Sequence, residues 1–315
     1  ARMIAYVIRR LVATIPVVLL VAVTVFLLVQ LAPGDPAAVI AGDNATSEQI
    51  ARIRTTLGLD EPLWKQFAIW FGHVIQGDLG TSLYWNQPVI ELIGQRMWPT
   101  ISLACTTILL AVVLALTLGV LAAWKAGTLL DRSVMAIAVT GFSVPVFVVG
   151  YLLVYLFAIE LKWLPVQGYR PMNEGVWPWF ERLILPSVAL GLAYVALIAR
   201  ITRTTMLEVL AEDYIRTADA KGVATRPMLL KHALKNAAVP IVTIVGIGIA
   251  LLIGGVVITE TVFNIPGVGR LVVDAIARRD YPIIQGVILV FSGVYVVVNL
   301  LVDLSYTLFD PRVRY

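Results

Sequence analysis

A polar, charged segment at residues 213–222 lies between two strongly apolar stretches. Its sequence is Asp213-Tyr214-Ile215-Arg216-Thr217-Ala218-Asp219-Ala220-Lys221-Gly222. Basic residues crowd the segment and its flanks, namely Arg200, Arg203, Arg216, Lys221, Arg226, Lys231 and Lys235. Such charge is typical of cytoplasmic loops of membrane proteins. Because the segment is too long and too well patterned for a simple turn, we interpret it as a docking element that offers charge-based recognition.

Motifs for bond-making chemistry are missing from the sequence. No G-x-x-x-x-G-K-[ST] motif occurs, and Gly246-Ile247-Gly248 lacks the third glycine of a dinucleotide fingerprint. The two histidines, His73 and His232, are too far apart for a His-x-x-x-His metal site. Gly141-Phe142-Ser143 lacks the later glycine of a nucleophile elbow, and Cys105 has no partner for a disulfide within the chain. We therefore predict no catalytic residue, no metal and no cofactor in this chain.

The composition indicates a polytopic membrane protein. The chain is 59% hydrophobic and only 14% charged, whereas about 25% of the residues in a soluble domain are charged. The net charge of +4 does not point to nucleic acid, because no Lys/Arg run occurs and most basic residues lie at the ends of apolar stretches.

Six apolar stretches are long enough to cross a bilayer, which takes roughly 20 helical residues. They lie near Leu11–Leu31, Thr100–Ala123, Ser133–Ile159, Ile184–Met206, Ala237–Glu260 and Ile283–Leu304. The sequence therefore predicts an all-α fold of six transmembrane helices. Ser143-Val144-Pro145 is expected to break or kink the third, since proline frees backbone groups.

The first stretch has a second interpretation, as a signal peptide, because Arg9-Arg10 precede it. Its apolar run exceeds the 7–15 residues or so of a signal core. It ends in Pro33-Gly34-Asp35-Pro36 and not in a small-x-small cleavage site. We expect a retained helix.

Loop charge favours cytoplasmic N- and C-termini. In that orientation the inner segments carry Arg2, Arg9, Arg10, Lys125, Arg132, the seven basic residues above, Arg312 and Arg314. The short outer loops carry Lys162, Arg170, Arg182, Arg270, Arg278 and Arg279. The segment 32–99 is left out, because long loops cross the membrane largely regardless of charge.

Residues 32–99 are expected to form a small folded outer cap. Thr46 and Ser47 precede a helix-like pattern, and Leu63–Phe71 is amphipathic and aromatic, as in helices at a membrane interface. Gly77-Asp78-Leu79-Gly80 and Asn86-Gln87-Pro88 are typical of turns.

Residues 208–240 resemble the cytoplasmic "EAA" loop of ABC importer permeases, with Glu208-Val209-Leu210-Ala211-Glu212 leading into 213–222 and Leu229-Leu230-Lys231-His232-Ala233-Leu234-Lys235-Asn236-Ala237 following. The nearest subfamily is the dipeptide/oligopeptide one, in its first-permease (B-type) branch. Further motifs of that branch occur in order: Pro33-Gly34-Asp35-Pro36, Leu57-Gly58-Leu59-Asp60, Gly77-Asp78-Leu79-Gly80-Thr81-Ser82, Glu260-Thr261-Val262-Phe263, Pro266-Gly267-Val268-Gly269-Arg270, Arg279-Asp280-Tyr281-Pro282 and Asp310-Pro311-Arg312-Val313-Arg314-Tyr315.

The resemblance implies a type I ABC importer permease fold in a bacterial inner membrane. Its parts are a first helix within 1–31, an extracytoplasmic cap at 32–99, a five-helix core at 100–310 with a coupling loop at 207–236, and a tail at 311–315. It implies a second homologous permease, two ATP-binding subunits that carry ATP and Mg, and an extracytoplasmic substrate-binding protein as partners. Substrates of such permeases are dipeptides, oligopeptides, glutathione, nickel complexes or opines.

By the same resemblance, the coupling residues are Asp213, Tyr214, Ile215, Arg216, Ala218, Lys221 and Gly222. Gly222 suits the turn between two short helices, because glycine accepts a positive φ. Tyr214, Ile215 and Ala218 fall near one helix face, which we expect to be buried, while Arg216 and Lys221 pair with carboxylates of the ATPase. The family has Glu where this chain has Arg216, so no Glu-mediated contact is carried over.

Polar residues inside apolar helices are candidates for the substrate pathway. They are Ser143, Tyr151, Tyr155, Tyr194, Glu260, Asn299 and Asp303. Hydrogen bonds between helices are the alternative role for each of them, and for the two acids an ion pair with a neighbouring arginine.

Two other functions remain open at this stage. An ion-coupled secondary transporter would carry a titratable residue near the bilayer midplane, whereas Glu260 and Asp303 lie near helix ends. A membrane scaffold without transport would not need the Gly-broken helix pair.

Overall fold

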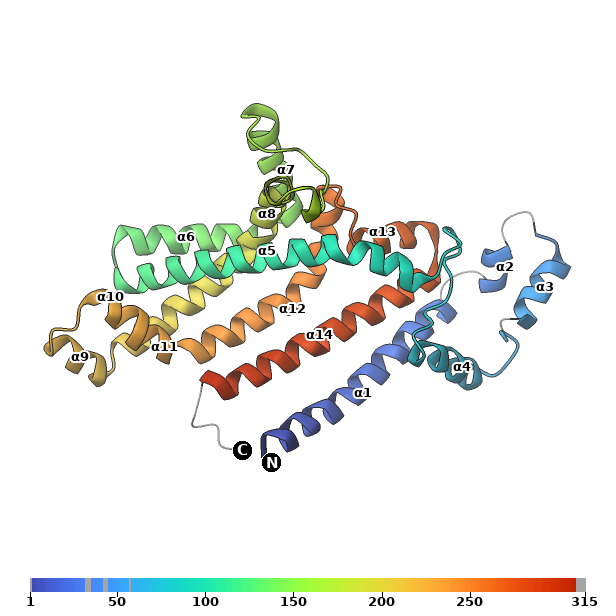
Figure 1. The fold of residues 1–315 in the computed structure, drawn as a ribbon, viewed down its shortest axis with the longest axis horizontal. Helices are drawn as coiled ribbons and strands as arrows, with labels where there is room; N and C mark the ends of the chain where they lie inside the picture. The colour runs from blue at the N-terminus through green and yellow to red at the C-terminus, as the bar shows by residue number, and fades with distance from the viewer. Residues whose placement is uncertain (1, 32–34, 42–44, 57, 310–315) are drawn as a thin grey trace. The chain divides into compact units, whose positions relative to one another are not determined.

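The computed structural model describes residues 2–31, 35–41, 45–56 and 58–309 of the 315. The long helices are α1 (Arg2–Leu31), α5 (Val89–Trp124), α6 (Leu129–Ser143), α8 (Val176–Leu210), α12 (Ala238–Val262) and α14 (Tyr281–Phe309) (Figure 1). The shorter ones are α2 (Pro36–Ala41), α3 (Ser47–Thr56), α4 (Leu63–Ile75), α7 (Val146–Leu153), α9 (Asp213–Ala220), α10 (Thr225–Pro227), α11 (Leu234–Asn236) and α13 (Val268–Arg278). Val154–Glu160 and Met228–Ala233 are π-helical, and Met172–Glu174 is a 3₁₀ turn. The tail predicted at 311–315 lies outside the described residues.

The predicted all-α membrane fold is confirmed. Five helices in the described part are long and apolar enough to cross a membrane, and a bent pair makes a sixth span if it is counted as one. The five are Val12–Leu31, Val89–Trp124, Val176–Leu210, Ala238–Val262 and Tyr281–Leu304. Each overlaps one of the predicted stretches.

The third predicted span is broken where proline was expected to break it. Leu129–Ser143 and Val146–Glu160 meet at an angle of 106°. Val144 has φ −88° and ψ 128°, which is extended backbone. A residue before proline disfavours the α region because the proline ring clashes with its backbone. Pro145 then starts the second half as its N-cap.

Two spans begin earlier than predicted, and the reason is the same in both. Pro99 lies inside α5 and Pro186 inside α8. Hydropathy placed the starts at Thr100 and Ile184, because the charged residues Arg96 and Arg182 come shortly before the continuous apolar runs. Prolines are tolerated inside membrane helices when neighbouring groups satisfy the freed carbonyls.

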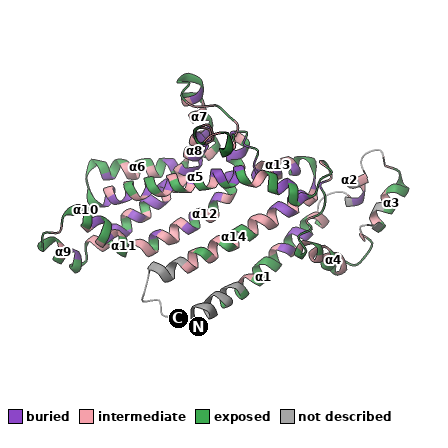
Figure 2. Cartoon of the chain, viewed as in Figure 1, coloured by how far each residue is buried: buried purple, intermediate pink, exposed green. Residues whose placement is uncertain are grey.

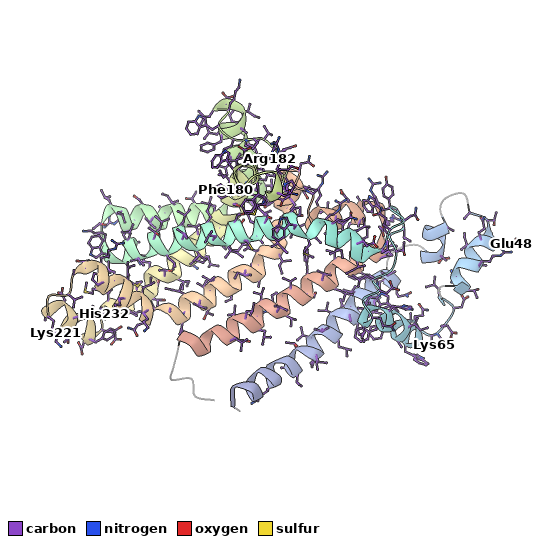
Figure 3. The ribbon with its side chains drawn as sticks, viewed as in Figure 1. Glu48, Lys65, Phe180, Arg182, Lys221 and His232 are labelled. Carbon is purple, nitrogen blue, oxygen red and sulfur yellow. The ribbon has the colours of Figure 1, made fainter. Side chains whose placement is uncertain are left out.

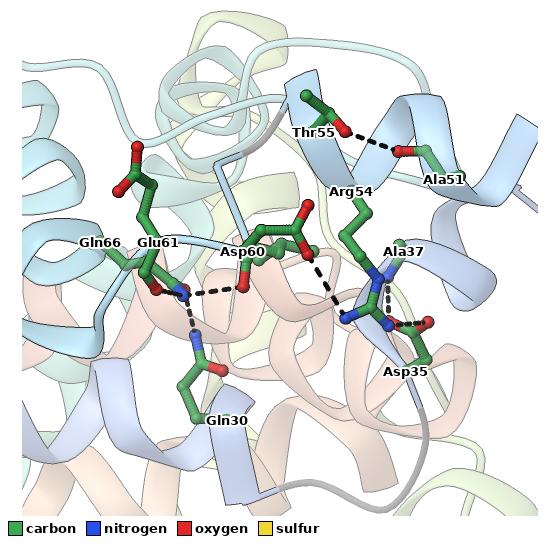
Figure 4. A network of polar contacts seen from close by, with 10 residues as sticks. Gln30, Asp35, Ala37, Ala51, Arg54, Thr55, Asp60, Glu61 and Gln66 are labelled. Carbon is green, nitrogen blue, oxygen red and sulfur yellow. Dashed lines mark hydrogen bonds and ion pairs between the residues drawn. The ribbon is translucent and has the colours of Figure 1, made fainter.

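The chain forms two compact units, and the first comprises residues 3–98 with 270–296. Its small helices are fastened by polar contacts. The N–H of Gln49 donates to Thr46 Oγ1 (3.3 Å) and the N–H of Thr46 to Gln49 Oε1 (2.9 Å), a reciprocal capping box that starts α3. Arg54 pairs with Asp35 at 2.5 Å, and Gln66 accepts a hydrogen bond from Gln30 at 2.9 Å (Figure 4).

Helix α4 packs on α1 within this unit through aromatic rings. Phe26 lies 5.5 Å from Phe67 and 5.7 Å from Trp70, measured between ring centroids. The exposed side of α4 remains apolar, with Trp64 and Ile75 more than two-thirds exposed. These features support the expectation of an interfacial helix, since tryptophan favours the membrane boundary.

The second unit comprises residues 99–269 with the described residues from 297 to 309, and α8 lies at its centre. Helix α8 packs against α6, α7 and α12. More than half of its span is buried, the largest share among the candidate spans (Figure 2). Small residues permit close packing, because a Cβ on Gly119 of α5 would lie 2.8 Å from the Ala199 carbonyl oxygen of α8.

An ion pair joins α6 to α8 within the same unit. Arg203 Nε lies 2.5 Å from Asp131 Oδ1, and Arg203 Nη2 lies 2.7 Å from Asp131 Oδ2. The N–H of Gly127 also donates to Asp131 Oδ2 at 2.9 Å. The Asp131 side chain is 95% buried, so the bidentate arginine satisfies a carboxylate that water does not reach.

The glycine packing predicts that Gly119→Ala lowers the thermal unfolding midpoint of the purified protein. Alanine improves helix propensity by up to about 1 kcal/mol, but overpacking costs typically 1–3 kcal/mol. Gly254→Ala is the matched control, because no atom lies within 4 Å of a Cβ there. An unchanged midpoint for Gly119→Ala in detergent would contradict the packing.

The ion pair predicts that Asp131→Ala destabilises the chain by the lower part of the roughly 3–5 kcal/mol typical of breaking a buried pair. The lower part applies because the Arg203 side chain is 26% exposed and can turn toward polar surroundings. Replacing both residues by leucine should recover most of the lost stability. Equal midpoints for the single and the double variant would argue against the pair.

Candidate functional site

Helix α9 (Asp213–Ala220) is too short to be stable by itself, since isolated helices below roughly 12–15 residues are marginal. Tertiary packing must hold it. Ile215 is its buried residue, at 4% exposure. Burying such a side chain contributes roughly 1.5–3 kcal/mol.

The cluster around Ile215 joins several helices of the second unit. Its buried members are Val120, Ala123, Met206, Ile215, Leu229, Ala233, Ala237 and Ile241. They come from α5, α8, α9, the π-helical turn, the residue before α12, and α12 itself. Ile215 therefore links α9 to three long helices, α5, α8 and α12, in one tightly packed cluster.

Gly222 ends α9 as the sequence predicts. Its φ is +78°, and its N–H donates to the Asp219 carbonyl at 2.8 Å. The N–H of Val223 donates to the Ala218 carbonyl at 3.1 Å. Together these bonds make a Schellman cap, in which the first residue past the cap takes the left-handed conformation that glycine adopts without strain.

The exposed face of α9 is charged. The Asp213 side chain is 98% exposed and that of Arg216 is 73% exposed, and the two lie 3.5 Å apart. Lys221, the residue after α9, is also exposed (Figure 3). An exposed pair of this kind is worth at most about 1 kcal/mol, so these charges are free to meet an outside partner.

The predicted buried face of α9 needs correction. Ile215 is buried and Ala218 half-buried, but Tyr214 is 42% exposed. Spacing places Tyr214 beside Ile215, yet adjacent helical positions lie about 100° apart, so only one of them points into the cluster. Partial burial raises the pKa of the Tyr214 hydroxyl, the Glu212 carboxylate raises it further, and a hydrogen bond with Asn236 opposes both.

A π-helical turn at Met228–Ala233 follows the Gly222 break. It brings Leu229 and Ala233 into the cluster while leaving Leu230 and Lys231 exposed. The side-chain amide of Asn236 donates to the His232 carbonyl at 2.6 Å, closing the last turn. π-Helical turns of this kind occur frequently at functional sites.

The candidate pathway residues are not gathered in one cavity. Ser143 lines a cavity of about 120 Å³, and Tyr194 lines a separate one of about 10 Å³. Tyr151 and Tyr155 are both exposed, one helical turn apart. Asn299 and Asp303 are half-buried, also one turn apart on α14. Their role in a pathway stays a prediction.

Glu260, the remaining candidate, is fully buried near the C-terminal end of α12. Thr100 Oγ1 donates to its Oε1 at 2.5 Å, and the N–H of Val268 donates to the same Thr100 oxygen at 2.9 Å. A Cβ on Gly267 would overlap the Glu260 carboxylate. The Pro-Gly-Val-Gly loop is therefore wrapped over this acid. Sequence reasoning missed this arrangement, although glycines shortly after an acid were a visible signal.

Comparisons with known proteins identify the family of the chain. Residues 115–315 match the family described as binding-protein-dependent transport system inner membrane component, and residues 3–104 match the family of its N-terminal part. The chain is 58% identical over 310 residues to the probable peptide ABC transporter permease protein y4tP of Sinorhizobium fredii, covering 98% of this chain and 99% of that one.

It is also 45% identical over 313 residues to the glutathione transport system permease protein GsiC of Salmonella typhimurium, covering 99% and 100% of the two chains. Among solved structures, a chain of the inward-facing MetNI methionine ABC transporter is similar, with a TM-score of 0.58 at 17% identity. That likeness covers 70% of this chain and 97% of the other, and it confirms the predicted type I importer fold. The chain therefore belongs to the family of binding-protein-dependent transport system inner membrane components, the permease subunits of ABC importers.

Proposed function

We propose that this chain is the peptide-type permease of an ATP-driven importer and that α9 is its coupling helix. The single observation that carries the second part is the two-sided character of α9. One side is fixed to three long helices through Ile215, and the other presents exposed charge. A connector between a moving partner and a helix bundle needs both sides.

The proposed partners are a second homologous permease, two ATP-binding subunits and a substrate-binding protein. The family description supports the last of these, since it names binding-protein-dependent transport. ATP and Mg would be held by the ATP-binding subunits, which supply the free energy of hydrolysis. No step of that hydrolysis is assigned to residues of this chain.

The mechanism we propose is alternating access. When the ATP-binding subunits close, they move α9, and the Ile215 cluster passes the motion to α5, α8 and α12. The cap at 32–99 and the segment 261–282 would receive the loaded binding protein on the other side. The loop over Glu260 belongs to that segment, and its Val268 N–H ties it to Thr100 within α5.

The orientation that we propose has both termini in the cytoplasm of a bacterium, and the chain in its inner membrane. It rests on the asymmetry of basic residues between the loops. The same orientation puts α9 and Gly222 inside, where ATP is available. It also puts the apolar, tryptophan-bearing side of α4 at the outer membrane interface.

The proposed substrates are peptides or similar small solutes. The named relatives are a probable peptide permease and a glutathione permease, and glutathione is itself a small peptide. Scattered polar groups suit such a pathway better than one tight charged site. In the described conformation Tyr151 and Tyr155 are accessible, whereas Glu260 is buried in its loop. Family membership leaves the ion-coupled transporter without support.

The exposed charges of α9 predict the outcome of a double charge reversal, Arg216→Glu with Lys221→Glu. Loss of charge pairs at an interface should weaken association with the ATP-binding subunit on the order of tenfold to a thousandfold. The unfolding midpoint should not change, because both side chains are exposed. The measurement is quantitative mass spectrometry of subunits that co-purify with the chain.

Arg170→Glu is the control for this experiment, since Arg170 is exposed in the loop between α7 and α8. It should leave co-purification intact. Recovery of the chain as a monomer or homodimer, with no ATP-binding subunit even for the unmodified protein, would overturn the importer proposal. Full co-purification of the charge-reversed variant would overturn only the assignment of α9.

The Schellman cap predicts a graded series at Gly222. Space is not the constraint, because nothing lies within 4 Å of a Cβ there. The constraint is the left-handed backbone conformation, which costs an ordinary residue roughly 1–2 kcal/mol. ATP-dependent uptake in proteoliposomes should fall from Gly to Asn to Ala to Val. Equal uptake by Gly222→Val and the unmodified protein would show that the cap does not matter.

A further inference from the structure

A groove of about 540 Å³ lies between α5 and residues 225–234, which follow α9 in the chain. Its volume falls within the roughly 300–1,000 Å³ typical of small-molecule sites. Helix α5 lines it with Leu116, Thr117, Val120, Leu121 and Trp124, and the opposite wall consists of Thr225, Arg226, Leu229, Leu230 and Leu234. None of these residues is acidic.

The groove continues an exposed apolar surface of α5. Helix α5 is a candidate span, and Leu109 and Val113 are 67% and 55% exposed on it. One and two turns further along come Thr117 and Leu121, which line the groove. An apolar chain lying along the exposed side of α5 would therefore run into the groove without crossing polar surface.

One basic residue lines the groove and a second follows its last α5 residue. Trp124 ends α5, and the Lys125 ammonium lies 4.2 Å from the centroid of its ring. Arg226 lines the groove beside the hydroxyl-bearing Thr225. A tryptophan with flanking cations marks the level of lipid headgroups. The groove thus has a largely apolar lining, with Arg226 in it and Lys125 next to its Trp124.

We propose that this groove binds an anionic phospholipid. One acyl chain lies between α5 and the wall at Leu229–Leu234, and the phosphate meets the Arg226 guanidinium and the Lys125 ammonium. Basic pockets between membrane helices bind anionic headgroups for this electrostatic reason. A neutral acyl ligand would gain nothing from the two exposed cations, whereas an anionic headgroup would.

The bound lipid also contacts the coupling machinery. Leu229 and Val120 belong both to the groove and to the Ile215 cluster. Occupancy should stiffen that cluster and raise the yield of transport for each ATP hydrolysed. This consequence rests on the proposed function, whereas lipid binding requires only that α5 crosses a membrane.

The test is the lipid retained by the whole purified complex from membranes holding phosphatidylglycerol and phosphatidylethanolamine, measured by native mass spectrometry. Phosphatidylglycerol should be enriched on the unmodified protein. Lys125→Gln with Arg226→Gln should lower that enrichment roughly tenfold or more, since each cation near an anionic surface contributes about a factor of five. Lys235→Gln, an exposed cation on α11 outside the groove lining, is the control.

Three results would overturn the proposal. They are equal retention of the two lipids, loss of phosphatidylglycerol on adding millimolar inorganic phosphate, and unchanged enrichment in the double variant. Leu230→Trp narrows the groove without touching charge and should also reduce retention. Because retention is measured without transport, a complex that fails to take up peptide still answers the lipid question.

Discussion

The proposed coupling depends on one buried side chain, that of Ile215, which holds α9 against the helix bundle. Helix α9 is eight residues long and meets the bundle through Ile215. Its charged face is therefore left for another molecule, while its motion reaches α5, α8 and α12 through one cluster. A larger apolar face would hold α9 more firmly and leave less charge exposed. The small attachment fits a connector.

The Schellman cap that ends α9 also ends two other helices. Gly222 after α9, Asn264 after α12 and Arg279 after α13 all have positive φ, with the two backbone hydrogen bonds of a Schellman cap. Each cap redirects the chain, and the segment that follows differs from case to case. After α12 the redirected loop covers Glu260, and after α9 it leads to the π-helical turn.

Hydropathy and local chemistry predicted those structural features that depend on residues close together in the sequence. The spans, the break at Ser143-Val144-Pro145, the helix start at Thr46-Ser47 and the turn at Gly222 all follow from residues within one or two helical turns. The pairs Asp131–Arg203 and Thr100–Glu260 do not, because their members are 72 and 160 residues apart. Only packing brings such partners together.

The direction in which a side chain of α9 points could not be predicted from the sequence either. Tyr214 and Ile215 are adjacent, and each has an apolar side chain or ring that could be buried. Only the position of the neighbouring helices decides that Ile215 is the buried one. The most direct test of this arrangement is site-specific photo-cross-linking in membranes, with benzoylphenylalanine at position 216 or 215. We expect an adduct with the ATP-binding subunit from position 216, and from position 215 only adducts within this chain. Adducts with the ATP-binding subunit from position 215 and none from 216 would contradict the coupling role of α9.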